Sequence, residues 1–175
     1  MTTMQIDPTH TSVEFGVKHM MISTVRGSFK DVSGSITVGD RPAVEVTIPV
    51  ATIDTGVAQR DEHLRSADFF DAANFPAMTF TGTLVDGDIA TGGTLAGDLT
   101  IRGVTRPVTL SVEANGEGKD PWGNTRLGFT ATGTIDRTTF GLTWNQALET
   151  GGILVSEKVK LMIDVQVVKP AEVGV

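Results

Sequence analysis

Histidine and acidic side chains occur together in one short segment, and they are the best candidates in this chain for acid–base chemistry. His63 lies near Asp61 within segment 57–70, where an imidazole could act as a general base or contact a polar head group. The alternative is a packing helix that closes one end of the fold, and we favour this interpretation. We therefore expect no catalytic residue in this chain.

Metal and nucleophile chemistry have little support elsewhere in the sequence. His10 and His19 are well separated from His63, and no two histidines have the HxH or HxxxH spacing of a metal site. Ser66 and Ser156 lie outside a GxSxG motif, so acyl transfer is not indicated. The chain has no Cys, which removes disulfides, thiolate zinc sites and cysteine nucleophiles. We expect neither a metal nor a cofactor.

Composition limits the possible partners. The 175 residues carry a formal net charge of −7, which on average repels nucleic acids and anionic membrane surfaces. No apolar stretch is long enough to span a bilayer, and segment 1–7 lacks the basic start and apolar run of a secretory leader. We predict a cytoplasmic protein with no nucleic-acid partner and no integral membrane span. It would be periplasmic or secreted if a leader has been removed.

Apolar and polar residues alternate along most of the chain, and this pattern must position any site. A period of two predicts strands with one dry and one wet face. We expect eight strands, at 12–17, 25–38 (with a β-bulge near Lys30–Asp31), 43–50, 78–84, 95–101, 108–113, 127–135 and 158–167. Such a chain must stack two sheets or close one sheet into a barrel.

Two segments interrupt the alternation. Segment 57–70 is the one stretch rich in helix-compatible residues, which predicts a short helix between strands three and four, ending near Asp71. Segment 18–24 contains His19, Met20, Met21 and Ile22, and we expect a short helical turn across one end. No linker or repeat divides the chain, so residues 1–175 are predicted to form a single domain.

The inward-facing positions predict a cavity with an apolar lining. Several are unusually small, which leaves volume unfilled: Gly27, Gly34, Gly82, Gly97, Ala131 and Gly133. Alternatively, these glycines mark strongly curved corners of a barrel. The remaining inward residues are apolar and carry no charge to pair with a buried ionic head: Phe15, Phe29, Val46, Ile48, Phe80, Leu99, Leu110, Phe129, Ile163 and Val165. We expect them to bind an apolar ligand.

Further apolar residues are expected near the mouth of the cavity. We place Met21, Phe70 and Trp144 there. An apolar lid could form here from five aromatic residues: Phe69, Phe70, Phe75, Phe140 and Trp144. The alternative is that these aromatic residues are ordinary core beneath a long loop over 138–152.

Specific motifs distributed over essentially the whole chain resemble the YceI-like family. The most diagnostic is RDEHLRSADFFD at 60–71, and the others are segments 6–15, 18–21, 25–27 with Phe29, 75–76, 99–105, 107–108, and 140–142 with Trp144. The resemblance implies an all-β, eight-stranded antiparallel barrel similar to lipocalins. It also implies a long isoprenoid lipid as ligand, such as a polyisoprenoid or an isoprenoid quinone with its tail inside the barrel, and a possible homodimer.

Three functions remain open at this point. The first is non-catalytic binding, storage or transport of an isoprenoid or other long-chain apolar lipid. The second is an enzyme that acts on the bound lipid with His63 and Asp61 as acid and base. The third is a stress-linked interaction scaffold, which predicts a filled interior.

Overall fold

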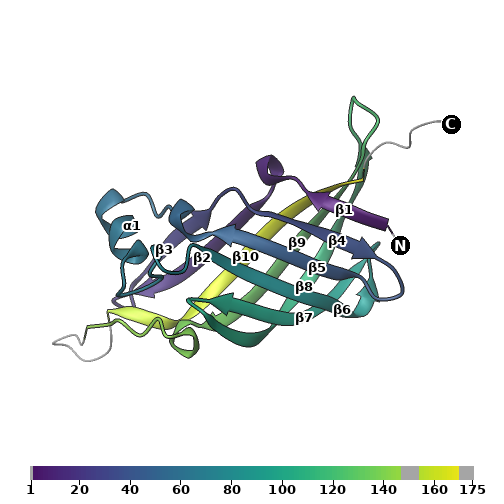
Figure 1. The fold of residues 1–175 in the computed structure, drawn as a ribbon. Coiled ribbons are helices and arrows are strands. Elements are labelled where there is room, and N and C mark those ends of the chain that lie inside the picture. Colours follow the sequence, from purple (N-terminus) through teal and green to yellow (C-terminus); the bar gives the residue numbers. More distant parts are fainter. Residues whose placement is uncertain (1, 147–153, 170–175) are drawn as a thin grey trace.

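The computed structural model describes residues 2–146 and 154–169, and within them the chain forms ten strands of one antiparallel sheet with one α-helix (Figure 1). The strands are β1 (Thr2–Ile6), β2 (Ser12–His19), β3 (Ser23–Phe29), β4 (Ser33–Val38), β5 (Ala43–Pro49), β6 (Ala77–Asp88), β7 (Gly92–Ile101), β8 (Val104–Lys119), β9 (Thr125–Asp136) and β10 (Val155–Lys169). The helix α1 spans Ala58–Arg65, and short 3-10 helices occupy Pro8–His10 (η1), Val50–Thr52 (η2) and Arg137–Phe140 (η3).

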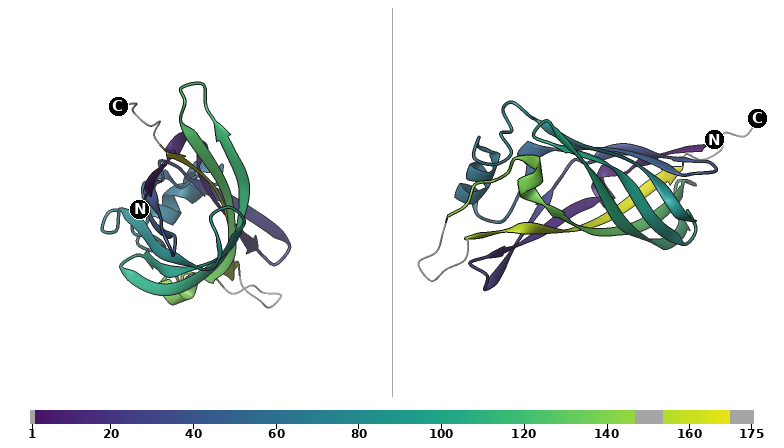
Figure 2. Two further views of the ribbon diagram at one scale, coloured as in Figure 1. Left: turned by 90° about the vertical axis from the view of Figure 1, so that its right-hand side faces the viewer. Right: turned by 90° about the horizontal axis from the view of Figure 1, so that it is seen from below.

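Eight of these strands close into a ring. Neighbouring strands pair in the order β1-β4-β5-β6-β7-β8-β9-β10, and β1 pairs back to β10 through Gln5 with Val168 and Ile6 with Val167. The rest of the same β10 edge pairs with β2, so the β2–β3 hairpin extends the wall on one side. The predicted eight-stranded antiparallel barrel with a short helix is confirmed, and Figure 2 shows the ring along its axis.

Three differences from the predicted elements lie outside the helix α1. Strand β1 was not predicted, because its five residues contain only Met4 and Ile6 as apolar members. The predicted strand over 25–38 is split where the bulge was expected: β3 ends at Phe29, β4 begins at Ser33, and Asp31 between them has a φ of 58°. Segment 18–24 is not helical, because it forms the end of β2, a tight turn and the start of β3.

Helix α1 lies between β5 and β6, as predicted, but ends at Arg65 rather than near Asp71. The chain then continues in turns, in which the Phe70 amide donates to the Leu64 carbonyl and the Ala72 amide to the Arg65 carbonyl. Leu64 is the one large apolar residue in the helix. No helix in the described part of the chain is long and apolar enough to cross a bilayer.

A charged cluster ties the N-terminal strand to the end of the barrel opposite α1. The Asp7 carboxylate accepts hydrogen bonds from Arg126 Nη1 at 2.6 Å and His10 Nδ1 at 2.9 Å, and Arg126 Nε also bonds Asp120 Oδ2 at 3.0 Å. Arg126 and then His10 hold the pKa of the Asp7 carboxyl well below its usual range. The cluster therefore stabilises the junction of β1, β9 and β10 when Asp7 is ionised.

Replacing Asp7 by Asn should expose this contribution through its pH dependence. We expect Asp7→Asn to lower the free energy of unfolding at neutral pH by about 1–3 kcal/mol, because Arg126 and His10 lose a charged acceptor. A lowered native pKa gives stability that is present above the unfolded-state pKa of about 4 and lost as the pH falls below it. Denaturant unfolding from neutral pH to below about pH 4 should therefore show that the difference in free energy of unfolding between variant and wild type becomes smaller in acid. Asp40→Asn, in the exposed turn after β4, is the control and should show no such gap.

Candidate ligand-binding cavity

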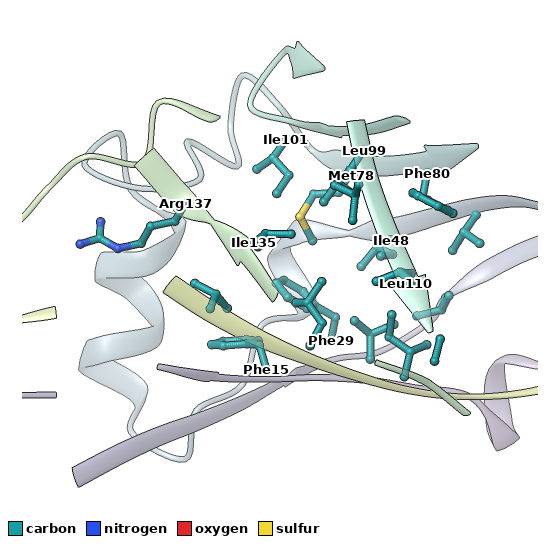
Figure 3. A pocket seen from close by; sticks show the side chains of 18 of the residues that line it. Phe15, Phe29, Ile48, Met78, Phe80, Leu99, Ile101, Leu110, Ile135 and Arg137 are labelled. Atoms are coloured by element: carbon teal, nitrogen blue, oxygen red, sulfur yellow. The ribbon is translucent and has the colours of Figure 1, made fainter. Parts of the chain in front are cut away.

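A cavity of about 410 Å³ runs through the interior of the barrel, within the usual range of ligand sites, about 300–1,000 Å³. Its walls are side chains from all ten strands and from α1, most of them apolar, and Figure 3 shows them converging from opposite sides of the ring. Because alternate residues of every strand point inward, the apolar half of the sequence pattern is the half that lines the cavity.

The exposure of the lining shows that the interior is hollow rather than filled. Phe15, Val46, Leu161 and Ile163 face the interior, yet each is only half-buried. In a filled core such residues would lose nearly all of their accessible surface, because core side chains interdigitate with few voids. Their remaining surface therefore faces the cavity.

The inward glycines shape this wall by letting neighbouring side chains lie flat. A Cβ at Gly82 would come within 2.9 Å of the Phe80 ring, and one at Gly133 within 2.6 Å of Leu110 Cδ2. The ring of Phe15 likewise occupies the space beside Gly27. Adjacent lining residues thus occupy the space beside these glycines. As a result, large side chains lie against the wall and the centre of the cavity stays open.

Helix α1 closes one end of the barrel through polar contacts. The buried Asp61 carboxylate accepts from the Thr55 amide at 2.8 Å and from the Thr55 hydroxyl at 2.5 Å. Arg60 Nε donates to the same hydroxyl at 2.7 Å, and Arg65 Nε donates to the Ala51 carbonyl at 3.0 Å. These bonds position a helix whose own sequence offers little apolar surface.

His63 packs in this cap as a member of an aromatic cluster. Its ring meets Trp144 and Phe69 edge-on, with centroid distances of 4.9 and 5.2 Å, and its Nε2 lies 2.9 Å from Asp68 Oδ2. Asp61 bonds Thr55 instead, so the residues proposed as an acid–base pair do not share a hydrogen bond. The geometry favours the packing interpretation of His63.

Arg137 is a buried cation beside the same end of the cavity. Its guanidinium donates to the carbonyls of Leu142 at 2.6 Å, Trp144 at 3.0 Å, Val155 at 3.0 Å and Ser156 at 2.9 Å. Burial lowers its pKa from the ordinary value, yet an arginine remains charged. The guanidinium points away from the apolar lining (Figure 3). Arg137 therefore fastens the segment after η3 to the start of β10.

Eleven of the twelve predicted ligand-binding residues line the cavity. Nine form the wall: Phe15, Phe29, Val46, Ile48, Phe80, Leu99, Leu110, Phe129 and Ile163. Phe70 and Trp144 lie at the α1 end. Met21 does not line it, because it occupies the tip of the β2–β3 turn and is 62% exposed. The role of the eleven residues in binding stays a prediction.

Sequence reasoning missed other lining residues. Met78, Ile101, Ile135 and Leu161 have the inward parity of predicted strands, so the alternation could have identified them. The expectation of an uncharged lining was wrong at the ends of the cavity, where the lining includes Lys18, Arg60, Asp88 and Arg137. The alternation does not identify these four as lining residues, because their positions depend on how the ends of the barrel are closed.

The expected aromatic lid is divided between core and cavity. Phe69 and Phe140 are buried, with 5% and 1% exposure, and Phe70 and Trp144 are half-buried. Phe69, Phe70 and Trp144 line the cavity, whereas Phe140 belongs to the core and does not line it. Phe75 lies outside the lining and faces Gly103. Residues 147–152 of the predicted loop over 138–152 lie outside the described part of the chain. Across the described ranges, no group of three or more metal-ligating side chains is present.

Comparison with known proteins gives consistent matches. The YceI-like domain matches residues 4–167. Protein YceI of Escherichia coli O157:H7 is 45% identical over 139 residues, which cover 76% of this chain and 71% of that protein. The resemblance inferred from the sequence motifs is confirmed.

Solved structures share the barrel. Burkholderia cenocepacia BcnA superposes with a TM-score of 0.78 at 22% identity, covering 92% of this chain and 98% of that chain. A polyisoprenoid-binding domain from Saccharophagus degradans superposes with a TM-score of 0.67 at 16% identity, covering 95% and 98%. At these identities the likeness shows the fold.

Replacing Arg137 by Lys should destabilise the end of the barrel that α1 closes. We expect a loss of about 2–4 kcal/mol in the free energy of unfolding, because one ammonium cannot reach four carbonyls and leaves buried acceptors unpaired. Denaturant titration followed by circular dichroism measures the loss. Arg106→Lys is the matched control, since Arg106 is exposed and donates to the neighbouring Thr105 carbonyl. Equal midpoints for the two variants would contradict the role assigned to Arg137.

Proposed function

Because this chain belongs to the YceI-like domain family, we propose that its barrel binds a long isoprenoid lipid, such as a polyisoprenoid or an isoprenoid quinone, and stores or transports it without chemical change. The observation that carries the proposal is the cavity, which is hollow and almost wholly apolar along its length. The structural neighbour described as a polyisoprenoid-binding domain supports the same class of ligand. An interaction scaffold with a filled interior is disfavoured by that cavity.

Tail burial supplies enough free energy without a charged anchor. Each buried CH₂ group contributes roughly 0.8 kcal/mol before ordering costs. Large ligands retain about 0.3 kcal/mol per heavy atom, so a tail of about forty carbons would bind with roughly −12 kcal/mol, near nanomolar affinity. Such a ligand is held mainly by hydrocarbon contact, which suits the wall of Phe, Leu, Ile and Val side chains.

We infer that the head group lies at the end closed by α1, because most of the polar lining is found there. Lys18, His19, Thr55, Arg60 and His63 line the cavity there. At the opposite end the polar lining includes Thr11 and Asp88. Because the α1 end presents cations and hydrogen-bond donors, it suits a head group that accepts hydrogen bonds, such as a quinone carbonyl or a hydroxyl.

The binding proposal is tested by blocking the cavity from one strand. Phe80→Arg should abolish uptake of ubiquinone from detergent solution, because the guanidinium would be desolvated inside an apolar cavity. Thr81→Arg is the matched control, since the next residue of β6 is exposed on the outer face and should bind as wild type does. Binding is followed by quenching of Trp144 in a Trp122→Phe background, which leaves one tryptophan. Native mass spectrometry of freshly purified protein adds the mass of any bound lipid and the number of subunits.

Repeated absence of a bound apolar molecule, together with no uptake of ubiquinone or a polyprenol by wild type, would refute lipid binding. Uptake by Phe80→Arg equal to wild type would remove that residue from the binding wall.

A chemical role for His63 is tested separately from binding. We expect wild type and His63→Ala to return a polyprenol with unchanged mass after incubation, because His63 packs against Trp144 and Phe69 and is not bonded to Asp61. Mass spectrometry of the extracted ligand provides the measurement. Conversion by wild type that is lost in His63→Ala would instead establish the enzyme alternative.

A further inference from the structure

The turn between β2 and β3 exposes three consecutive large apolar side chains. Met20 is 42% exposed, Met21 62% and Ile22 81%. Figure 2 shows this hairpin projecting from the body of the barrel at the end where α1 lies. We refer to Met20, Met21 and Ile22 as the apolar tip. Contiguous exposed apolar residues on a soluble barrel indicate contact with a partner or a membrane.

The backbone of the apolar tip is also unfavourable for the residues that occupy it. Met20 and Met21 have φ values of 53° and 62°, and the Ile22 amide donates to the His19 carbonyl at 3.2 Å, which closes a β-turn with two left-handed central residues. Turns of this kind favour Asn and Gly, because a β-carbon clashes with the backbone there. Among the described residues, neither backbone preference nor core packing accounts for two methionines at these positions, which favours a contact with a partner or a membrane.

The apolar tip is continuous with the cavity. Val17, His19 and Val25, which flank the turn on β2 and β3, line the cavity together with Leu154. Leu154 is also the residue whose carbonyl accepts from the Met20 amide at 2.8 Å. A molecule in contact with the tip is therefore next to the α1 end of the cavity.

The charges around the apolar tip differ from those of the whole chain. Segment 17–27 contains Lys18, His19 and Arg26 and no acidic residue, whereas the chain as a whole carries −7. Lys18 and Arg26 are both exposed. Basic residues beside an apolar tip allow contact with phosphate groups while the apolar side chains leave water.

We propose that the apolar tip inserts into the interfacial region of a lipid bilayer and positions the α1 end of the barrel to take up lipid from it. The inference rests on the proposed function for its purpose, but binding of the tip to a bilayer can be measured alone. A bilayer suits the tip better than a protein partner, because three residues on a narrow hairpin present far less surface than the roughly 800 Å² that each side of a stable protein interface buries. A bilayer is also where a long isoprenoid resides.

Co-sedimentation with phosphatidylcholine vesicles tests the docking step. Wild type should sediment with the vesicles. The double variant Met20→Asn, Met21→Gly should have a partition coefficient at least about tenfold lower, because both apolar side chains are lost. The same pair of substitutions suits a left-handed turn, so the melting temperature should be unchanged or raised, which separates lost docking from lost folding. Binding should persist at high salt, since apolar insertion rather than the net charge drives it.

Two exposed apolar residues elsewhere provide matched controls. Val85 is 49% exposed near the end of β6, and Trp122 is 77% exposed in the β8–β9 turn, both away from the apolar tip. Val85→Asn and Trp122→Ser should sediment as wild type does. Wild type that stays in solution overturns the proposal, and so does loss of sedimentation in Trp122→Ser with retention in the tip variant. A tip variant that instead changes the subunit count in native mass spectrometry would assign the tip to a second copy of the chain.

Uptake assays separate this proposal from the proposed function. The tip variant should take up ubiquinone from detergent as wild type does and from vesicles at least several-fold more slowly. If wild type takes up no lipid from detergent, lipid binding fails whatever the sedimentation shows. If wild type takes up lipid from both sources and the tip variant matches it from vesicles, lipid binding stands and the role of the tip fails.

Discussion

Closure of the ring between β1 and β10 is the constraint on which the interior depends. Only two residue pairs, Gln5 with Val168 and Ile6 with Val167, join these strands, yet they remove the open edge that a curled sheet would otherwise present. The ion cluster of Asp7, Arg126 and Asp120 follows directly after this contact. A small paired region supported by charged hydrogen bonds thus converts a twisted sheet into a closed wall, and closure gives the inward residues a common interior.

Closure alone does not leave that interior empty. A ring of eight strands is near the size at which inward side chains just fill the centre. Here the Phe80 ring lies against the space beside Gly82 and Gly97, and the Phe15 ring lies beside Gly27. The large side chains are consequently laid along the wall rather than across it. The pattern of large and small inward residues is therefore a property of the cavity, and mutation of a glycine would push a ring toward the centre.

The sequence predicted the wall better than the ends. Alternation identified most of the strands, and the same parity placed nine cavity residues of the wall. The switch of parity near Lys30 predicted a bulge at the position where the chain breaks between β3 and β4. Strand β1 is too short for alternation to be informative. The β2–β3 turn has Met20 and Met21 at the positions where such turns usually have Gly or Asn, so the sequence did not predict a turn there. Arg137 bonds only backbone carbonyls, and a pattern of side-chain types carries no information about them.

The two ends of the barrel are consequently unequal. At the end opposite α1, the ring is closed by strand pairing and by the ion cluster around Arg126. At the other end, α1 is eight residues long, too short for a stable helix by itself, and is held by the hydrogen bonds of Thr55 with Asp61 and Arg60 and of Arg65 with Ala51. Displacing α1 requires the loss of a few polar contacts, which water can replace, and of the packing of Leu64 and His63, whereas opening the wall requires the loss of a strand ladder. The α1 end, where the apolar tip also lies, is therefore the end of the barrel whose covering element is the most easily displaced.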